Sequence, residues 1–199
     1  MKLTTRELVT MGVFGALWGG VEISLGSLFH TLNVPMTGMF LSAIGLLVVM
    51  VARYFVPRVG SSLFLGVIVA LLKMLSLGGI VIWPMIAIMF EALVAESVLT
   101  VSKTNTRWTF MITGGLGVFY TLVHPFFSQG LLAGSGVLFV WEMLLQQGSR
   151  VFGIPVEAAW SVIGIMALVH LVVGIVAGYL AWDVARLARG RISPSVVEV

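Results

Sequence analysis

Ionisable side chains inside long apolar stretches are the residues of this chain best placed to do chemistry. The chain is 59% hydrophobic and only 10% charged, and an ionisable group within such a stretch normally faces a protein interior or a wet cavity, because exposure to lipid is costly. Carboxylates, an ammonium and imidazoles gathered in one layer can orient a small polar solute, which points to binding or transport. These residues are Glu22, Lys73, Glu91, Glu96, His124 and His170.

The apolar stretches that carry these residues are long enough to cross a membrane as helices. A hydrocarbon core of ~30 Å takes roughly 20 helical residues, lipid cannot satisfy free backbone groups, and the alternation typical of barrel strands is missing. We therefore expect an all-α integral membrane protein, forming a single transmembrane domain over residues 1–199. Its spans, about six in number, are predicted near residues 8–28, 36–56, 62–77, 80–101, 108–127 and 156–185.

Two of these spans leave an alternative open. The first follows a basic start like that of a signal peptide, but it has no small-residue cleavage site at a suitable distance and is interpreted as a retained helix. The third is short and ends at Gly78-Gly79, so it could also be a broken helix that turns back within the membrane, which would reduce the count to five.

Basic residues predict the direction in which the spans run. With six spans and a cytoplasmic N-terminus, both termini are cytoplasmic, and the inner side receives almost all Lys and Arg, as the positive-inside rule requires. Only Arg150 falls outside and Lys73 within a span. This sorting, rather than nucleic-acid binding, explains the net charge of +3 and indicates the cytoplasmic membrane of a cell. The inner set is Lys2, Arg6, Arg53, Arg58, Lys103, Arg107, Arg186, Arg189 and Arg191.

One long outer loop is predicted over residues 128–155. Its stretch from Val137 to Leu145 is a candidate interfacial helix, and the loop is either a functional cover or a connection of no chemical interest. Three tryptophans near span ends are interpreted as belt residues at the headgroup level rather than as ligands. These are Trp108, Trp160 and Trp182.

The direction of the spans places most of the costly charges in one polar layer. At 1.5 Å per residue, Glu22, Lys73 and His124 fall in the outer half of the bilayer, Glu91 lies near the middle, and Glu96 lies deeper. We expect a binding pocket that opens outward, with Trp83 as a stacking surface. The alternative is internal pairing, in which Lys73 neutralises Glu22 or Glu91. His170 has no charged neighbour at i±4 and is interpreted as a packing residue.

Small residues cluster on the first span. Gly12 and Ala16, Gly15 and Gly19, and Ala16 and Gly20 have the small-xxx-small spacing that lets helices approach closely. Because these positions cover more than one helix face, part of the small surface is expected to meet a partner protein.

Several catalytic motifs are missing from the sequence. It contains no Walker A loop, no His-Glu-x-x-His pair and no Gly-x-Ser-x-Gly elbow, and it has no cysteine. We expect no cofactor, no metal and no enzymatic activity. Energy from ATP, where it is used, must come from another subunit.

A local motif pattern resembles the substrate-binding S-components of energy-coupling factor (ECF) transporters. The likeness runs from Arg58-Val59-Gly60 through Leu77-Gly78-Gly79 to Glu91-Ala92-Leu93-Val94-Ala95-Glu96, about a fifth of the chain, and is nearest to the thiamine or hydroxymethylpyrimidine type. The resemblance implies that the protein captures a vitamin-like solute from outside, with a T-component and two ATPase subunits driving its release inward. It also implies a coupling role for the small-residue face at Gly12 and Ala16, together with Gly15 and Gly19.

These observations leave three hypotheses of different class. The first is a binding subunit whose polar residues are Glu91, Glu22, Lys73, His124, Trp83 and Glu96. The second is a membrane scaffold in which the charges only pair with one another. The third is an intramembrane enzyme that uses Glu91, Glu96 and a histidine as acid-base or metal groups.

Overall fold

The protein is described by a computed structural model that covers residues 3–76 and 82–192. Every regular element in these ranges is a helix, as the sequence predicts. The elements are α1 (Thr5–Thr31), α2 (Thr37–Phe55), α3 (Ser61–Lys73), α4 (Ile82–Val101), α5 (Arg107–Pro125), the π-helix η1 (Phe126–Leu132), α6 (Val137–Phe152) and α7 (Ala159–Ile192).

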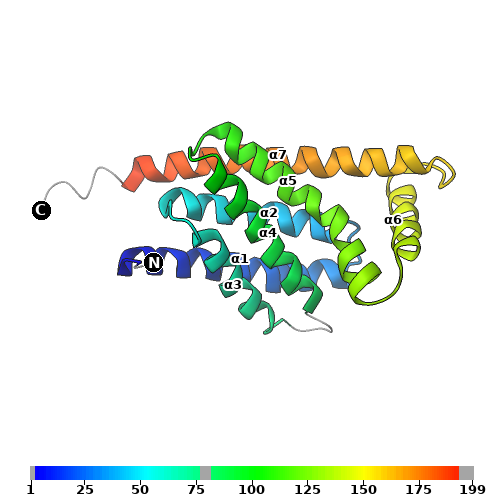
Figure 1. The fold of residues 1–199 in the computed structure, drawn as a ribbon, viewed down its shortest axis with the longest axis horizontal. Coiled ribbons are helices and arrows are strands. Elements are labelled where there is room, and N and C mark those ends of the chain that lie inside the picture. The colour runs from blue at the N-terminus through cyan, green and yellow to red at the C-terminus, as the bar shows by residue number, and fades with distance from the viewer. Residues whose placement is uncertain (1–2, 77–81, 193–199) are drawn as a thin grey trace, which may run out of the picture.

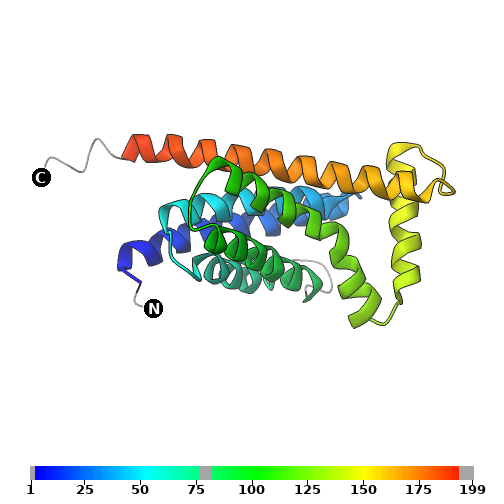
Figure 2. The same cartoon turned by 45° about the horizontal axis from the view of Figure 1, so that its top comes forward.

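The long helices form one bundle, and α6 lies across one end of it. Figures 1 and 2 both show α1, α2, α5 and α7 running along the long axis, with the start of α1 and the end of α7 at the same end. Helix α6 crosses the opposite end, where α1 and α5 finish and α7 begins. The expected helix at Val137–Leu145 is thus present and continues to Phe152.

Within residues 3–76 and 82–192, five helical segments are long and apolar enough to cross a membrane, and the predicted third span is not among them. Helix α3 has 13 residues, which corresponds to about 20 Å and falls short of the ~30 Å hydrocarbon core. The prediction of six full spans is therefore not confirmed. The motif Gly78-Gly79 lies outside the described residues.

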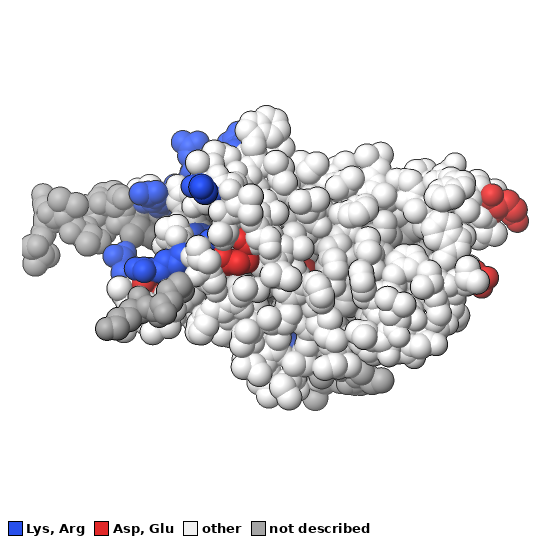
Figure 3. All heavy atoms as spheres, viewed as in Figure 1, with Lys and Arg blue, Asp and Glu red and all other residues white. Residues whose placement is uncertain are grey.

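Charged side chains gather at the end where α1 begins. Figure 3 shows Lys and Arg concentrated there on the face in view, and two ion pairs link neighbouring elements at this end, Glu7 with Arg58 and Asp183 with Arg107. The end also collects the short connections after α2 and α4. The described basic residues that the sequence assigns to the inner side of a membrane thus lie at one end of the bundle. Which side of the membrane this end faces stays a prediction.

Glycines make the contact between α5 and α7 unusually close. A Cβ atom on Gly174 would collide with the backbone carbonyl of Gly114, and one on Gly178 would collide with that of Phe110. Helix backbones can approach this closely only where side chains are absent. Helices α5 and α7 therefore form a rigid wall, and the same wall carries His124 and His170.

This contact makes a prediction about glycine substitutions within one helix. Gly174→Ala should lower the thermal unfolding midpoint in detergent, because the added methyl group meets backbone that cannot move aside, at a cost of roughly 1–3 kcal/mol. Gly164→Ala, at an open position on the same helix, is the matched control and should leave the midpoint unchanged or raise it slightly. Equal midpoints for the two variants would contradict the close contact.

Candidate binding cavity

A large cavity lies between the helices near the end that α6 crosses. Its volume is about 970 Å³, at the upper limit of the range usual for small-molecule sites. Side chains from α1, α2, α4, α5, η1, α6 and α7 line it, together with Lys73 at the end of α3. The cavity is therefore enclosed by almost every element of the bundle.

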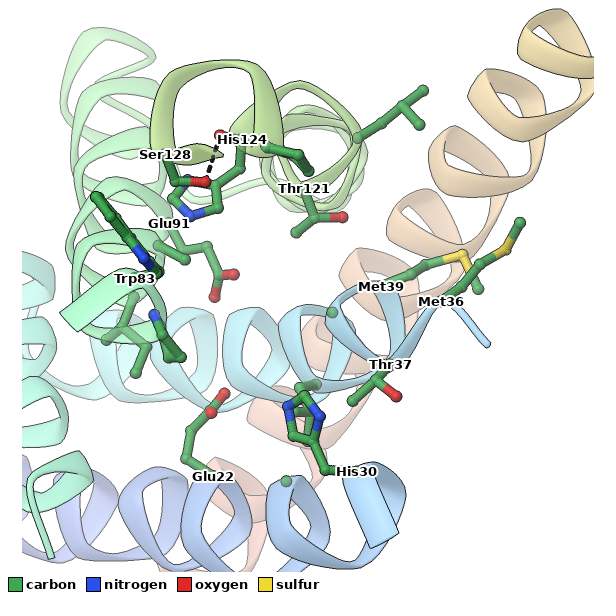
Figure 4. Close-up of a pocket in the computed structure, with 18 of the residues that line it drawn as sticks. Glu22, His30, Met36, Thr37, Met39, Trp83, Glu91, Thr121, His124 and Ser128 are labelled. Carbon is green, nitrogen blue, oxygen red and sulfur yellow. Dashed lines mark hydrogen bonds between the residues drawn. The ribbon is translucent and has the colours of Figure 1, made fainter. Parts of the chain in front are cut away.

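Five of the six predicted binding residues meet at this cavity. Figure 4 shows Glu22 and Glu91 on opposite sides, with Trp83 and His124 beside Glu91. Lys73 also lines the cavity. These five side chains, expected in one polar layer, thus line one cavity in the structure.

Lys73 and Glu22 form a buried ion pair. Lys73 Nζ lies 3.2 Å from Glu22 Oε2 and also donates to the Glu22 backbone carbonyl at 2.7 Å. Gly26 makes this second bond possible, because a Cβ atom there would lie only 2.9 Å from Lys73 Nζ. The expectation that Lys73 neutralises a nearby carboxylate is met at Glu22, so the pair carries no net charge.

Glu91 has no ion-pair partner among the residues that the structure describes. Its side chain is only 4% exposed, and within the described part of the chain its Oε2 atom accepts no hydrogen bond. Figure 4 shows the carboxyl group directed into the cavity. Buried polar groups are almost always satisfied, so an unpartnered carboxyl oxygen at a cavity wall is a position where a ligand can bind.

The π-helix places further polar groups on the wall near His124. Pro125 has no N–H and crowds the preceding turn, and beyond it the backbone bonds widen, with Ala133 N donating to Ser128 O at 2.9 Å. Ser128 Oγ donates to the His124 carbonyl at 3.1 Å, and His124 Nδ1 lies 2.8 Å from the Tyr120 hydroxyl. Such π-helical turns often occur at functional sites.

His170 lines the cavity too, which its interpretation as a packing residue missed. Its Nδ1 donates to the Met166 carbonyl at 2.7 Å, because a carbonyl can only accept. In the neutral ring this leaves Nε2 as an acceptor. The packing interpretation therefore accounts for Nδ1, which is bonded within α7, but not for the position of His170 in the cavity lining.

Glu96 was wrongly grouped with the binding residues, because it does not line the cavity and instead closes the start of α3. It accepts from the backbone N–H groups of Gly60 and Ser62 at 2.8 and 3.0 Å, and its Oε1 lies 3.2 Å from Arg53 Nη2. Gly60 precedes α3 and has no side chain to cap the helix, so a carboxylate from α4 supplies the cap. The role of Glu96 is structural.

Sequence reasoning also missed most of the uncharged polar groups of the site. They come from α1, α2, α5, η1 and α6, and the signal was weak because hydroxyl and amide side chains are common in membrane helices. Gln147 lies in the predicted outer loop, two residues beyond the candidate interfacial helix, and Ser128 and Gln129 begin the same loop. The groups that line the cavity are Ser27, His30, Thr31, Thr37, Ser76, Thr121, Ser128, Gln129 and Gln147, of which Ser76 follows α3.

The small residues of α1 divide between two faces. Gly15 and Gly19 pack against Ile68 and Leu72 of α3, so they are unavailable to a partner in this structure. The other face remains open, with Gly12 and Ala16 both exposed. Of the four predicted coupling positions, only Gly12 and Ala16 are therefore accessible to a partner protein in this structure.

The described residues contain no group of three or more His, Cys, Asp or Glu side chains placed to hold a metal ion. Comparison of the chain with protein-family models, with curated proteins and with solved structures gives no match. The cavity is therefore the feature of this chain from which a function can be inferred. Its chemistry is that of one unpaired carboxyl group, several hydrogen-bonding groups, and aromatic and sulfur-containing walls.

The two buried glutamates of α4 should respond differently to the same substitution. Glu96→Gln leaves Arg53 without its counter-charge and should lower the free energy of unfolding by roughly 3 kcal/mol, because one partner of a buried pair is removed. Glu91→Gln is its matched control on the same helix and should leave stability nearly unchanged. Reversible unfolding in mixed micelles measures both, and a larger loss for Glu91→Gln would contradict these assignments.

Proposed function

We propose that this protein is the substrate-binding subunit of an ECF-type importer. In this proposal it captures a small vitamin-like heteroaromatic solute, with thiamine or its pyrimidine precursor as the leading candidate. The solute enters from outside the cytoplasmic membrane. A T-component and two ATPase subunits then drive its release into the cell, since the chain has no ATP-binding motif of its own.

The observation that carries the proposal is the unpartnered carboxyl group of Glu91 at the wall of the cavity. A cavity of about 970 Å³ has ample room for a two-ring solute. A carboxyl group that accepts no internal hydrogen bond favours a ligand with N–H donors or a positive charge, since either would satisfy it. Glu91 is therefore the proposed polar anchor.

Other residues of the cavity suit an aromatic solute. Trp83 stands beside Glu91 in Figure 4 and offers a stacking face within reach of the same ligand. Thr121 and Gln147 supply hydrogen-bonding groups from two further helices. Lys73 does not oppose a cationic ring, because its charge is balanced by Glu22 at 3.2 Å.

A membrane scaffold is the second candidate, and two observations favour it. The pairs Glu22–Lys73 and Arg53–Glu96 are internal, as that hypothesis expects. The scaffold hypothesis does not explain why Glu91 is buried without an ion-pair partner among the described residues. Burying such a carboxyl group lowers the stability of the bundle and brings a purely structural protein no benefit. If Glu22, Lys73 and Glu91 can be replaced together by apolar residues with no loss beyond stability, the scaffold is favoured.

The proposed function predicts saturable binding by the purified protein. In a panel of B vitamins and their precursors, at least one heteroaromatic member should bind, and Glu91→Gln should weaken it tenfold or more, corresponding to about 1.4 kcal/mol or more. Glu142→Gln, an exposed carboxylate on α6, is the matched control and should bind like the unchanged protein. Equilibrium dialysis gives the affinities, and failure of the whole panel to bind would count against the proposal.

A further inference from the structure

With uncharged histidines, the charges that face the cavity balance only if Glu91 is neutral. Glu22 and Lys73 cancel one another at 3.2 Å, which leaves Glu91 as a carboxyl group at 4% exposure whose Oε2 atom has no hydrogen-bond partner among the described residues. An uncompensated ion in such a place costs several kcal/mol. A proton on the carboxyl group removes that cost.

The elements packed around Glu91 supply no free cation among the described residues. Lys73 is held by two bonds to Glu22, one to its carboxylate and one to its backbone carbonyl. His124 and His170 each have one ring nitrogen engaged, with Tyr120 and with the Met166 carbonyl. From α2 the hydroxyl of Ser42 lies close to the Glu91 carboxyl group, but it forms no hydrogen bond of normal geometry with a described residue and carries no charge. The titratable groups that line the cavity are Glu22, His30, Lys73, Glu91, His124 and His170.

From this arrangement, and on the basis of the proposed function, we infer that a cationic solute enters the cavity in exchange for the proton of Glu91. The O–H bond of the carboxyl group breaks, the proton passes to water, and the carboxylate forms an ion pair with the bound cation. The site is electrically neutral before and after the exchange. Without the exchange the bound cation would be the uncompensated charge.

An uncharged solute has a different consequence at the same site. It satisfies the Glu91 carboxyl group by hydrogen bonding, and the proton stays in the cavity, either on the carboxyl group or on a ring nitrogen of the solute. Net proton release therefore distinguishes a cationic from a neutral ligand. Thiamine and its hydroxymethylpyrimidine precursor, in mildly alkaline buffer, are a suitable pair of probes.

Isothermal titration calorimetry in two buffers of different ionisation enthalpy counts the protons released. Thiamine binding should release about one proton per solute and should strengthen up to tenfold per pH unit while Glu91 is protonated. The neutral pyrimidine should release none. Glu91→Gln should abolish proton release and weaken the cation more than the neutral probe, whereas Glu142→Gln should change neither value.

The possible contradictions can be separated from one another. Thiamine binding without proton release, or with release that Glu91→Gln does not affect, overturns the exchange and leaves the proposed function standing. Absence of binding by both probes and by the rest of the vitamin panel overturns the proposed function, and the exchange with it. A normal unfolding transition for Glu91→Gln shows that any loss of binding is local.

Discussion

A membrane interior offers a buried charge no water, so every ion in this bundle must be compensated by another group of the protein. Four of the buried ionisable side chains follow this constraint closely: Lys73 is shared between two oxygens of Glu22, and Glu96 binds Arg53 and the first amides of α3. These contacts fix α3 against α1 and α4. They also define Glu91 by contrast, since it is equally buried and lacks such contacts among the described residues.

The architecture could be predicted from the sequence because lipid leaves few choices. Long apolar stretches that cannot expose their backbone to lipid must be helices, and within the described residues, helices long and apolar enough to cross a membrane cover five of the six expected positions. The predicted third span is not confirmed: α3 has 13 residues and is held at both ends by side chains, Glu96 at its start and Glu22 at Lys73. Such anchoring stabilises a short helix without a full crossing. Hydropathy does not record these contacts.

The site could be predicted only in part. Burying a charge within a membrane span costs free energy, so residue type and depth alone are enough to single out Glu22, Lys73 and Glu91. The same reasoning does not show which group neutralises each charge. It assigns Glu96 to the binding site because the partners of Glu96 lie in the loop before α3 and on α2, far away in the sequence. Thr121 and Gln147 carry no charge and gave no comparable signal. The close contact of α5 with α7 could have been predicted from the small-xxx-small spacing of Gly174 and Gly178, which the sequence prediction does not include.

The central claim is that the cavity opens to the outside of the cell and holds the solute, and cysteine labelling tests it most directly because the chain has no cysteine. Gln147 lines the cavity from α6, and Lys103 lies in the connection after α4 at the opposite end. In intact cells a membrane-impermeant maleimide should label Gln147→Cys and should label it more slowly when the solute is present. Lys103→Cys should react only after the cells are permeabilised. Labelling of Gln147→Cys that requires permeabilisation, or that the solute does not slow, would contradict the account.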